Sequence, residues 1–229
     1  MKKLVVLTGA GISAESGLKT FRDSDGLWEG YDIQEVATPQ AWDWNRALVQ
    51  EFYNMRRKAV LEAEPNAAHY ALAKLESQYE VTIITQNIDD LHERGGSTNV
   101  MHLHGVITRS RSSVDPELTY AIEGWELGMD EKCELGSPLR PHVVWFGEDV
   151  PMIGKAMEIC AQADLFILIG TSLAVYPAAG LIHYVPDNAP KYIVDLNIPQ
   201  TNLRQNAIKI EEKATIGVPE LVEQLLAFI

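Results

Sequence analysis

Apolar residues recur along the chain with two different periods. Four of them, Leu4 to Leu7, form a continuous run that is typical of a short strand buried on both faces of a parallel sheet. Strands are also predicted at 81–84, 100–103, 165–169 and 191–196, and 143–146 is a further apolar run. The predicted strands belong to one sheet.

Apolar residues at spacings of three and four predict helices between the strands. The longest helix begins at Thr38, an N-cap residue type that precedes Pro39 in the first turn. Its main apolar face is predicted to hold Ala41, Trp44, Leu48, Phe52, Met55 and Ala59. A second stripe beside it contains Val49, Tyr53, Arg56 and Val60, and the pattern alone favours a solvated arginine there. Other helices are predicted at 65–76, 152–163, 178–184 and 219–229.

This alternation of strands and helices favours an α/β fold with a Rossmann-like, doubly wound parallel sheet. About 70 residues separate the first strand from the strand at 81–84, which is too long for a simple crossover. A helical module is therefore predicted between them. Residues 106–139 are polar and have an irregular pattern. We expect a smaller domain made of insertions.

A glycine-rich turn directly follows the first strand. Gly9, Gly11 and Ala14 have the G-x-G-x-x-[GA] spacing of a dinucleotide-binding turn, in which a helix N-terminus holds the phosphates. An ordinary Rossmann unit then presents a ribose-binding acid about 20 residues later. Here that distance leads to Phe21 and Arg22 and then to a loop, so the turn alone does not identify an ordinary dehydrogenase.

Composition narrows the class of protein. The 229 residues are 46% apolar, which suffices for one large or two small domains, and no apolar run is long enough for a membrane span. The N-terminus enters the first strand without a signal-peptide pattern, so we expect a soluble, cytoplasmic protein. A net charge of −13 argues against direct nucleic-acid binding. Two cysteines, Cys133 and Cys160, are too few for a disulfide framework.

Polar side chains stand at the ends of three predicted strands. Asn87 and Asp89 follow 81–84, His104 follows 100–103, and Thr171 and Ser172 follow 165–169. The carboxyl ends of parallel strands face the ligand crevice of an open α/β sheet. These groups are therefore predicted to converge near the glycine turn and to form one site.

Five blocks of sequence together resemble the sirtuin family. They are GAGISAESGLKTFR after the first strand, TQNIDDLHERGGS from Thr85, HLHG from His102, RPHVVWFGE from Arg140 and GTS from Gly170. Their order and their spread over nearly the whole chain match that family. The resemblance implies an NAD-binding domain of residues 1–29, 76–105 and 140–229, with a small domain of residues 30–75 and 106–139.

The resemblance also implies roles for individual residues. NAD is expected to contact Gly9, Ala10, Gly11, Glu15, Phe21, Arg22, Trp28, Gln86, Asn87, Ile88, Asp89, Gly170, Thr171, Ser172, Asn197 and Ala214. Catalysis is expected of His104, with Asn87 and Asp89 in the nicotinamide pocket. The acylated peptide is expected to add as a strand to Val144, Trp145, Phe146 and Gly147. His102 is expected to make only a cross-strand polar contact.

The implied reaction consumes NAD as a co-substrate. Cleavage of the nicotinamide–ribose bond makes an electrophilic carbon, and the acyl oxygen of a modified lysine held beside that carbon attacks it. His104 then acts as a base on a ribose hydroxyl. The products are free lysine, nicotinamide and O-acyl-ADP-ribose. Acylated lysines in proteins or peptides are the expected partners.

Two features refine this expectation. The family usually carries two cysteine pairs in the region of residues 106–139, but only Cys133 is present here, so no zinc is expected. Tyr53 and Arg56 resemble the Tyr-x-x-Arg pair of sirtuins that remove acidic acyl groups. They predict a desuccinylase and demalonylase with some deacetylase activity. A non-catalytic NAD-binding module and a protein mono-ADP-ribosyltransferase remain as alternatives.

Overall fold

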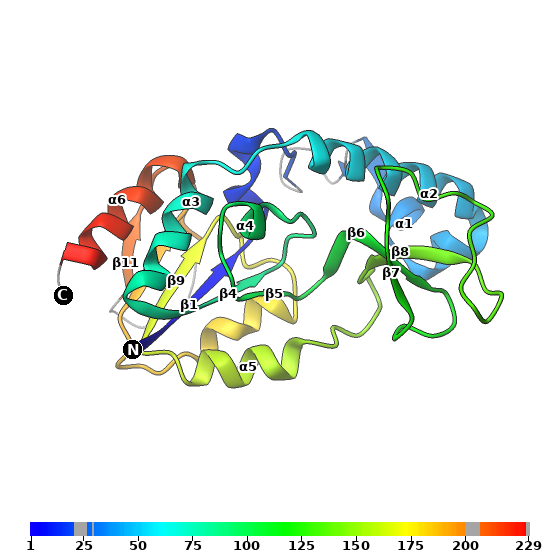
Figure 1. Ribbon diagram of the computed structural model, residues 1–229. Coiled ribbons are helices and arrows are strands. Elements are labelled where there is room, and N and C mark those ends of the chain that lie inside the picture. The colour runs from blue at the N-terminus through cyan, green and yellow to red at the C-terminus, as the bar shows by residue number, and fades with distance from the viewer. Residues whose placement is uncertain (21–26, 29, 200–206, 228–229) are drawn as a thin grey trace.

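A six-stranded parallel sheet forms the larger part of the molecule (Figure 1). The computed structural model describes residues 1–20, 27–28, 30–199 and 207–227, and at 27–28 it describes the backbone alone. In spatial order the strands are β11 (Ala207–Ile210), β10 (Lys191–Val194), β9 (Leu165–Ile169), β1 (Lys2–Thr8), β4 (Tyr79–Thr85) and β5 (Val100–His102). Each adjacent pair is parallel.

Helices cover both faces of this sheet. Leu4 and Val6 of β1 pack with α3 (Ala67–Lys74) and α6 (Ala214–Ala227), whereas Val5 and Leu7 pack with α5 (Ile153–Ala161) and the 3-10 helix η4 (Ala178–Tyr184). Because successive strand residues point to opposite faces, a continuous apolar run places two residues in each core. The predicted doubly wound α/β fold is confirmed.

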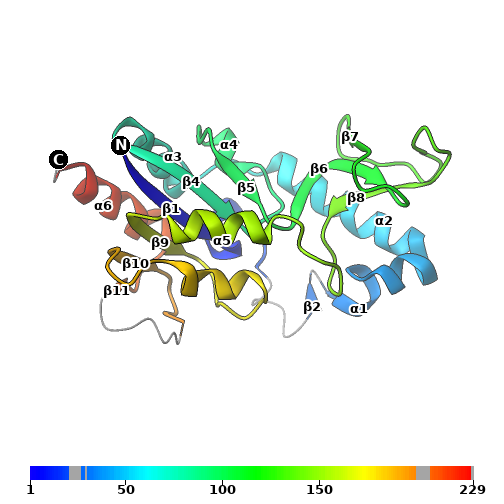
Figure 2. The same cartoon turned by 90° about the horizontal axis from the view of Figure 1, so that it is seen from below.

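A second, smaller sheet lies at the other end of the molecule (Figure 2). Its antiparallel order is β7 (Thr119–Ala121), β6 (Gly105–Ser112) and β8 (Leu139–Val143), and it packs against α2 (Pro39–Glu62). The prediction that residues 106–139 are irregular was wrong. Ser110 and Ser112 point inward and are buried, so β6 lacks the apolar alternation by which a strand is recognised.

The remaining elements in and next to the small domain are short. They are the two-stranded ribbon of β2 (Leu27–Trp28) and β3 (Tyr31–Asp32), followed by α1 (Ile33–Val36). In the large domain, η3 (Leu75–Ser77) precedes β4 and α4 (Leu91–Arg94) precedes β5. No helix in the described part of the chain is long and apolar enough to cross a membrane. The exact domain bounds given above remain a prediction.

Helix α2 buries only part of the predicted apolar face, together with the second stripe. Ala41 and Phe52 of the predicted face are buried, but Trp44 is 81% and Met55 43% exposed, whereas Val49 and Tyr53 of the second stripe are fully buried. The helix has a kink at Asn45, whose backbone is not helical and whose side-chain oxygen accepts from the N–H of Leu48. Asn45 thus acts as an N-cap inside the helix and changes the register on either side of it.

Arg57 is the most deeply buried cation of the small domain, and sequence analysis did not single it out. Its guanidinium donates to the carbonyl oxygens of Ile107 (2.6 Å) and Trp125 (2.8 Å) and to the side chain of Asn54 (2.6 Å). Burial lowers the pKa of Arg57 to about 10, which leaves it charged near neutral pH. Asn54 and Gln50 both donate to the carbonyl of Leu127. These three side chains attach residues 107–127 to α2.

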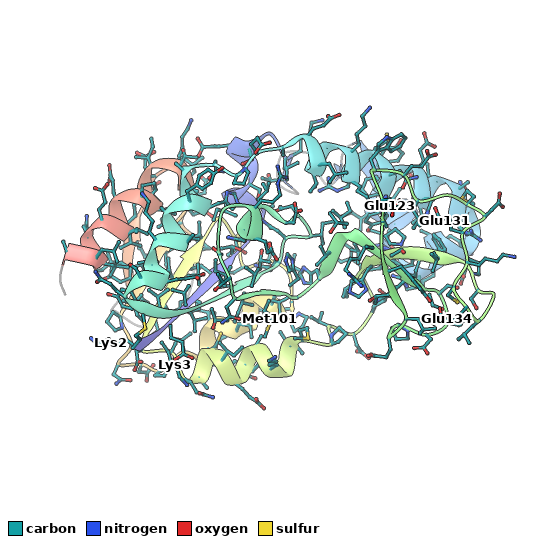
Figure 3. The ribbon with its side chains drawn as sticks, viewed as in Figure 1. Lys2, Lys3, Met101, Glu123, Glu131 and Glu134 are labelled. Carbon is teal, nitrogen blue, oxygen red and sulfur yellow. The ribbon has the colours of Figure 1, made fainter. Side chains whose placement is uncertain are left out.

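Cys133 follows this attached segment in the chain, and its thiol bonds to a hydroxyl. Its thiol donates to Oγ of Ser112 at 3.3 Å, and no group of three or more His, Cys, Asp or Glu side chains that could hold a metal occurs among the described residues. Acidic side chains of the segment, Glu123, Glu131 and Glu134, are spread over the end of the molecule away from Lys2 and Lys3 (Figure 3).

Chelators are expected to leave the protein unchanged. A metal-dependent fold loses the free energy of metal binding when the metal is removed, whereas the contacts of Arg57, Asn54 and Gln50 need no metal. We predict the same melting temperature and the same activity before and after incubation with EDTA. Thermal unfolding followed by circular dichroism, with elemental analysis of the purified protein, measures this. Stoichiometric zinc together with unfolding in EDTA would contradict the prediction.

Smaller differences from the predicted elements also occur. Strand β11 was not predicted, and the segment 178–184 forms a 3-10 helix rather than an α-helix. Strand β8 ends at Val143, so residues 144–146 lie outside it. Helix α6 begins at Ala214 and has Pro219 inside it, whereas the prediction began it at Pro219. By contrast, α3 begins as predicted, with Asn66 as its N-cap.

Candidate functional site

One large cavity, of about 620 Å³, lies at the carboxyl ends of the parallel strands, between the sheet and the small domain. Residues from both parts of the chain line it. Among those predicted from the sequence, the lining includes Gly9, Ala10, Gly11, Glu15, Tyr53, Arg56, Gln86, Asn87, Ile88, Asp89, His104, Val144, Trp145, Phe146, Gly147, Gly170, Thr171, Ser172, Asn197 and Ala214. Phe21 and Arg22 lie outside the described residues, as does the side chain of Trp28.

The glycine turn packs against the end of a neighbouring strand. A Cβ on Gly9 would lie 2.7 Å from the carbonyl oxygen of Gly170, and one on Gly11 would lie 2.6 Å from its Cα. The N–H of Gly11 donates to the Gly170 carbonyl at 2.9 Å. Glycine is therefore required here because two backbones meet, and Gly170 itself has φ of 60°.

The predicted α-helix after this turn is absent. Two 3-10 helices, η1 (Ala10–Ile12) and η2 (Ala14–Ser16), follow β1 instead. Gly17, with φ of 90°, ends the second short helix. Contact of the glycine turn with the phosphates of a dinucleotide stays a prediction.

Asn87, Asp89 and Ser13 form a buried polar cluster beside the turn. The amide nitrogen of Asn87 donates to Oγ of Ser13 at 3.2 Å, and this hydroxyl donates to a carboxylate oxygen of Asp89 at 3.1 Å. Burial raises the pKa of Asp89, against the lowering effect of hydrogen bonds from the Leu91 N–H and from Ser13. The cluster presents an amide and a carboxyl group to the cavity, which suits recognition of another amide.

His104 faces the same cavity with one ring nitrogen already bonded. Its Nδ1 lies 2.9 Å from the carbonyl oxygen of Gln86, which can only accept, so Nδ1 carries a proton. Burial lowers the pKa of His104, although the Gln86 carbonyl opposes this. The ring is therefore neutral near pH 7, with the lone pair on Nε2. This is the protonation state that a general base needs.

Two further contacts join loops that line the cavity at the ends of the parallel strands. Gln86 Nε2 donates to Oγ1 of Thr171 at 3.0 Å, which joins the ends of β4 and β9. Glu15 accepts from the hydroxyl of Thr215 at 2.7 Å and lies 3.6 Å from Nζ of Lys213. Despite some desolvation, these contacts lower the pKa of Glu15. The glycine turn is thereby connected to the start of α6.

Tyr53, Arg56 and Trp145 line the cavity from the small domain. The Tyr53 side chain is fully buried, and its ring centroid is 6.4 Å from that of Trp145. The Tyr53 hydroxyl and the Trp145 indole nitrogen are both buried; the indole N–H is near enough to donate to the Tyr53 oxygen, whereas the Tyr53 O–H has no acceptor among the described residues. Burial raises the pKa of Tyr53, against the lowering effect of the nearby charge of Arg56. The Tyr53 hydroxyl thus lies near the guanidinium of Arg56 in the lining of the cavity.

Three charged side chains that were not predicted from the sequence hold Trp145 in place. Glu148 accepts from Arg140 at 2.6 Å and from Arg111 at 3.2 Å, and it also accepts from the backbone N–H of Trp145 at 2.8 Å. The guanidinium of Arg140 lies 3.2 Å from the centre of the Trp145 ring. Arg140 and Glu148 flank the predicted substrate segment. Their opposite charges were the one sequence feature that could have indicated this ion pair.

Comparisons with known proteins agree with this architecture. The sequence pattern of the Sir2 family matches residues 9–177. A protein of Bacteroides thetaiotaomicron named NAD-dependent protein deacylase is 49% identical, and the match covers 99% of each chain. One of Helicobacter pylori with the same name is 50% identical over 99% of this chain and 98% of the relative.

A solved structure extends the likeness to three dimensions. A Sir2 homologue in complex with NAD superimposes with a TM-score of 0.90 and is 39% identical. The match covers 99% of this chain and 90% of the other.

Proposed function

This chain belongs to the Sir2 family and is an NAD-dependent protein deacylase, and on that premise we propose that it removes succinyl and malonyl groups from lysine, with deacetylation as an accompanying activity. The cavity is large enough for an extended ligand that reaches from the glycine turn to α2. NAD contributes a ribose carbon that becomes electrophilic when its bond to nicotinamide breaks.

The observation that carries the acyl preference is the unpaired hydroxyl of Tyr53. A buried hydroxyl whose O–H has no acceptor costs about 1–3 kcal/mol. A carboxylate at the end of an acyl chain would accept from the Tyr53 O–H and would pair with Arg56. An acetyl group has no atom that could do so. The cavity is therefore better matched to a short dicarboxylic acyl group.

Roles for the other side chains follow from their contacts. Asn87 and Asp89 would hold the carboxamide of nicotinamide, because their cluster with Ser13 offers both an acceptor and a donor. His104 would take the proton of a ribose hydroxyl through Nε2, since Nδ1 is held by Gln86. The hydroxyl can then attack the carbon that was the acyl carbonyl, lysine leaves with the proton that His104 took up, and addition of water gives O-acyl-ADP-ribose. Thr171, Ser172, Asn197 and Ala214 would contact the adenosine half.

The peptide would lie along residues 144–147. The N–H groups of Val144, Trp145 and Phe146 already donate to His104, Glu148 and Ala37 respectively. A substrate strand would therefore donate its own N–H groups to the carbonyl oxygens of this segment.

The double variant Tyr53→Phe with Arg56→Met is expected to lose desuccinylation selectively. A charge-assisted hydrogen bond contributes about 1.5–3 kcal/mol, so the loss of one such bond lowers kcat/KM by about tenfold to a hundredfold. Acetyl-lysine makes neither bond and should be processed within about threefold of the normal rate. Mass spectrometry of matched succinyl- and acetyl-lysine peptides, with free nicotinamide followed in parallel, measures both reactions.

Lys58→Met supplies the matched control, because Lys58 lies on the same helix with its side chain exposed. Equal loss on the two peptides would mean that Tyr53 and Arg56 are structural and that the protein is a plain deacetylase. Release of nicotinamide with a gain of ADP-ribose mass on the peptide would instead identify a mono-ADP-ribosyltransferase.

A further inference from the structure

The ring of His102 lies between two hydrogen-bond acceptors. Its Nδ1 is 3.0 Å from the carbonyl oxygen of Asn87, and its Nε2 is 2.7 Å from a carboxylate oxygen of Glu93 on α4. The His102 side chain is only 9% exposed. The sequence suggested a cross-strand contact for this histidine, but its partners lie instead on the loop after β4 and on α4.

These partners determine the protonation state of the ring. A carbonyl oxygen and a carboxylate can only accept hydrogen bonds, so both ring nitrogens must donate, and only the imidazolium has two N–H groups. Burial alone lowers the pKa of His102, but Glu93, the Asn87 carbonyl and the charge of Asp89 outweigh it and raise that pKa above its ordinary value. The pKa of Glu93 is lowered in turn, because His102 outweighs its partial desolvation.

The other titratable groups near His102 do not lower its pKa near pH 7. Asp89, after β4, is an acid that favours the imidazolium. His92 on α4 and His142 on β8 would oppose it if they were charged. Burial lowers the pKa of both, that of His142 to about 4, so both are neutral near pH 7.

The hydrogen bond from His102 is the third one that holds Asn87 in place. The Asn87 N–H donates to Oγ1 of Thr85 at 3.0 Å, and its side-chain amide donates to Ser13. His102 takes the remaining backbone group, the carbonyl. The neighbouring carbonyl of Gln86 is held in the same way by His104. Two histidines of HLHG thus hold two adjacent carbonyl groups of one loop, one ring charged and the other neutral.

We propose that His102, as an imidazolium paired with Glu93, is a positioning residue that fixes Asn87 for binding of the nicotinamide end of NAD. This inference rests on the role proposed above for Asn87. It separates the duties of the two histidines, since His104 must be neutral to accept a proton and His102 must be charged to hold both acceptors.

The pair has a specific consequence at alkaline pH. When His102 loses a proton, it keeps the Nε2–H bond to the charged Glu93 carboxylate and turns a lone pair toward the Asn87 carbonyl. The loop that carries Asn87 then loses its hydrogen bond from His102. In Glu93→Gln the side-chain amide can donate to Nε2, so a neutral ring retains its Nδ1–H bond to Asn87. That variant should lack the alkaline decline in kcat/KM for NAD.

Two experiments test the proposal. Nitrogen-15 NMR of histidine-labelled protein at pH 7.5 should show both nitrogens of His102 protonated, and in Glu93→Gln only Nδ1. In steady-state assays with an acetyl-lysine peptide, His102→Phe should lower kcat/KM for NAD about tenfold or more, since small misplacements of binding groups cost rate. The KM of the peptide should stay within about twofold. His183→Phe is the matched control, because His183 is exposed.

The outcomes separate this inference from the proposed role of Asn87. A neutral His102 at pH 7.5 in the NMR spectrum would overturn the inference, as would alkaline profiles that are the same for the wild type and Glu93→Gln. If Asn87→Ala impairs NAD kinetics while His102→Phe does not, the role of Asn87 stands and that of His102 falls. If Asn87→Ala leaves NAD kinetics unchanged, both fall.

Discussion

His104→Ala is expected to lower the rate of acyl-lysine removal by at least about a hundredfold, because general base catalysis contributes about 10²–10⁴ to such reactions. The side chain of His104 bonds to the carbonyl of Gln86 and to no residue of the glycine turn in the described part of the chain. NAD should therefore still bind with nearly its normal affinity. Isothermal titration with NAD, beside a mass-spectrometric deacylation assay, measures the two effects separately.

The pH dependence gives an independent check on the same residue. Burial lowers the pKa of His104 below its ordinary value, so the neutral base persists through neutral pH and is lost only as the pH falls through that lowered value. The acid limb of kcat/KM should accordingly lie below the pKa of a free histidine. Retention of more than a few per cent of activity in His104→Ala would remove His104 as the base.

Arg57→Leu is expected to destabilise the small domain by about 3–5 kcal/mol. The substitution keeps an apolar stem but leaves the carbonyl groups of Ile107 and Trp125 without this donor, whereas the Asn54 side-chain oxygen keeps the N–H of Leu127. Each buried acceptor that loses its partner costs about 1–3 kcal/mol. Chemical denaturation followed by tryptophan fluorescence measures the loss, with Lys58→Leu as the control at an exposed neighbouring position.

A difference between Arg57→Leu and the control of less than about 1 kcal/mol would show that the segment 107–127 is held by its apolar contacts instead. In that case the insensitivity to chelators predicted above would need another source, because no other buried cation links α2 to this segment among the described residues.

The sequence allowed the larger sheet to be predicted because its strands are local and continuous. Leu4 to Leu7 and 165–169 are buried on both faces, so each is apolar throughout and stands out without reference to any neighbour. Strand β11 escaped prediction because it lies at the edge and has exposed residues. The small sheet escaped because its buried positions include serines, whose hydroxyl groups find partners only once the strands are paired.

The residues of the candidate site were accessible from sequence for a related reason. Asn87, His104 and Thr171 each follow a strand directly, and the rule that parallel strands end at one edge brings them together. All described members of the predicted set line the one large cavity. The residues that position them, Ser13, Glu93 and Glu148, could not be predicted from the sequence. They are common polar residues, and their importance depends on which atoms they contact in the fold.

By itself, the amino-acid sequence determined the strands of the larger sheet other than β11, the glycine turn and the side chains at the strand ends, since these depend on residues close together in the chain. Only the tertiary structure decided which face of α2 is buried, because that face is the one that packs against Val143 and Trp145. It also decided the protonation of His102 and His104, which share one motif yet face different acceptors. The physical reason is that burial, charge and hydrogen bonding are properties of neighbours in space, which the folded chain brings together.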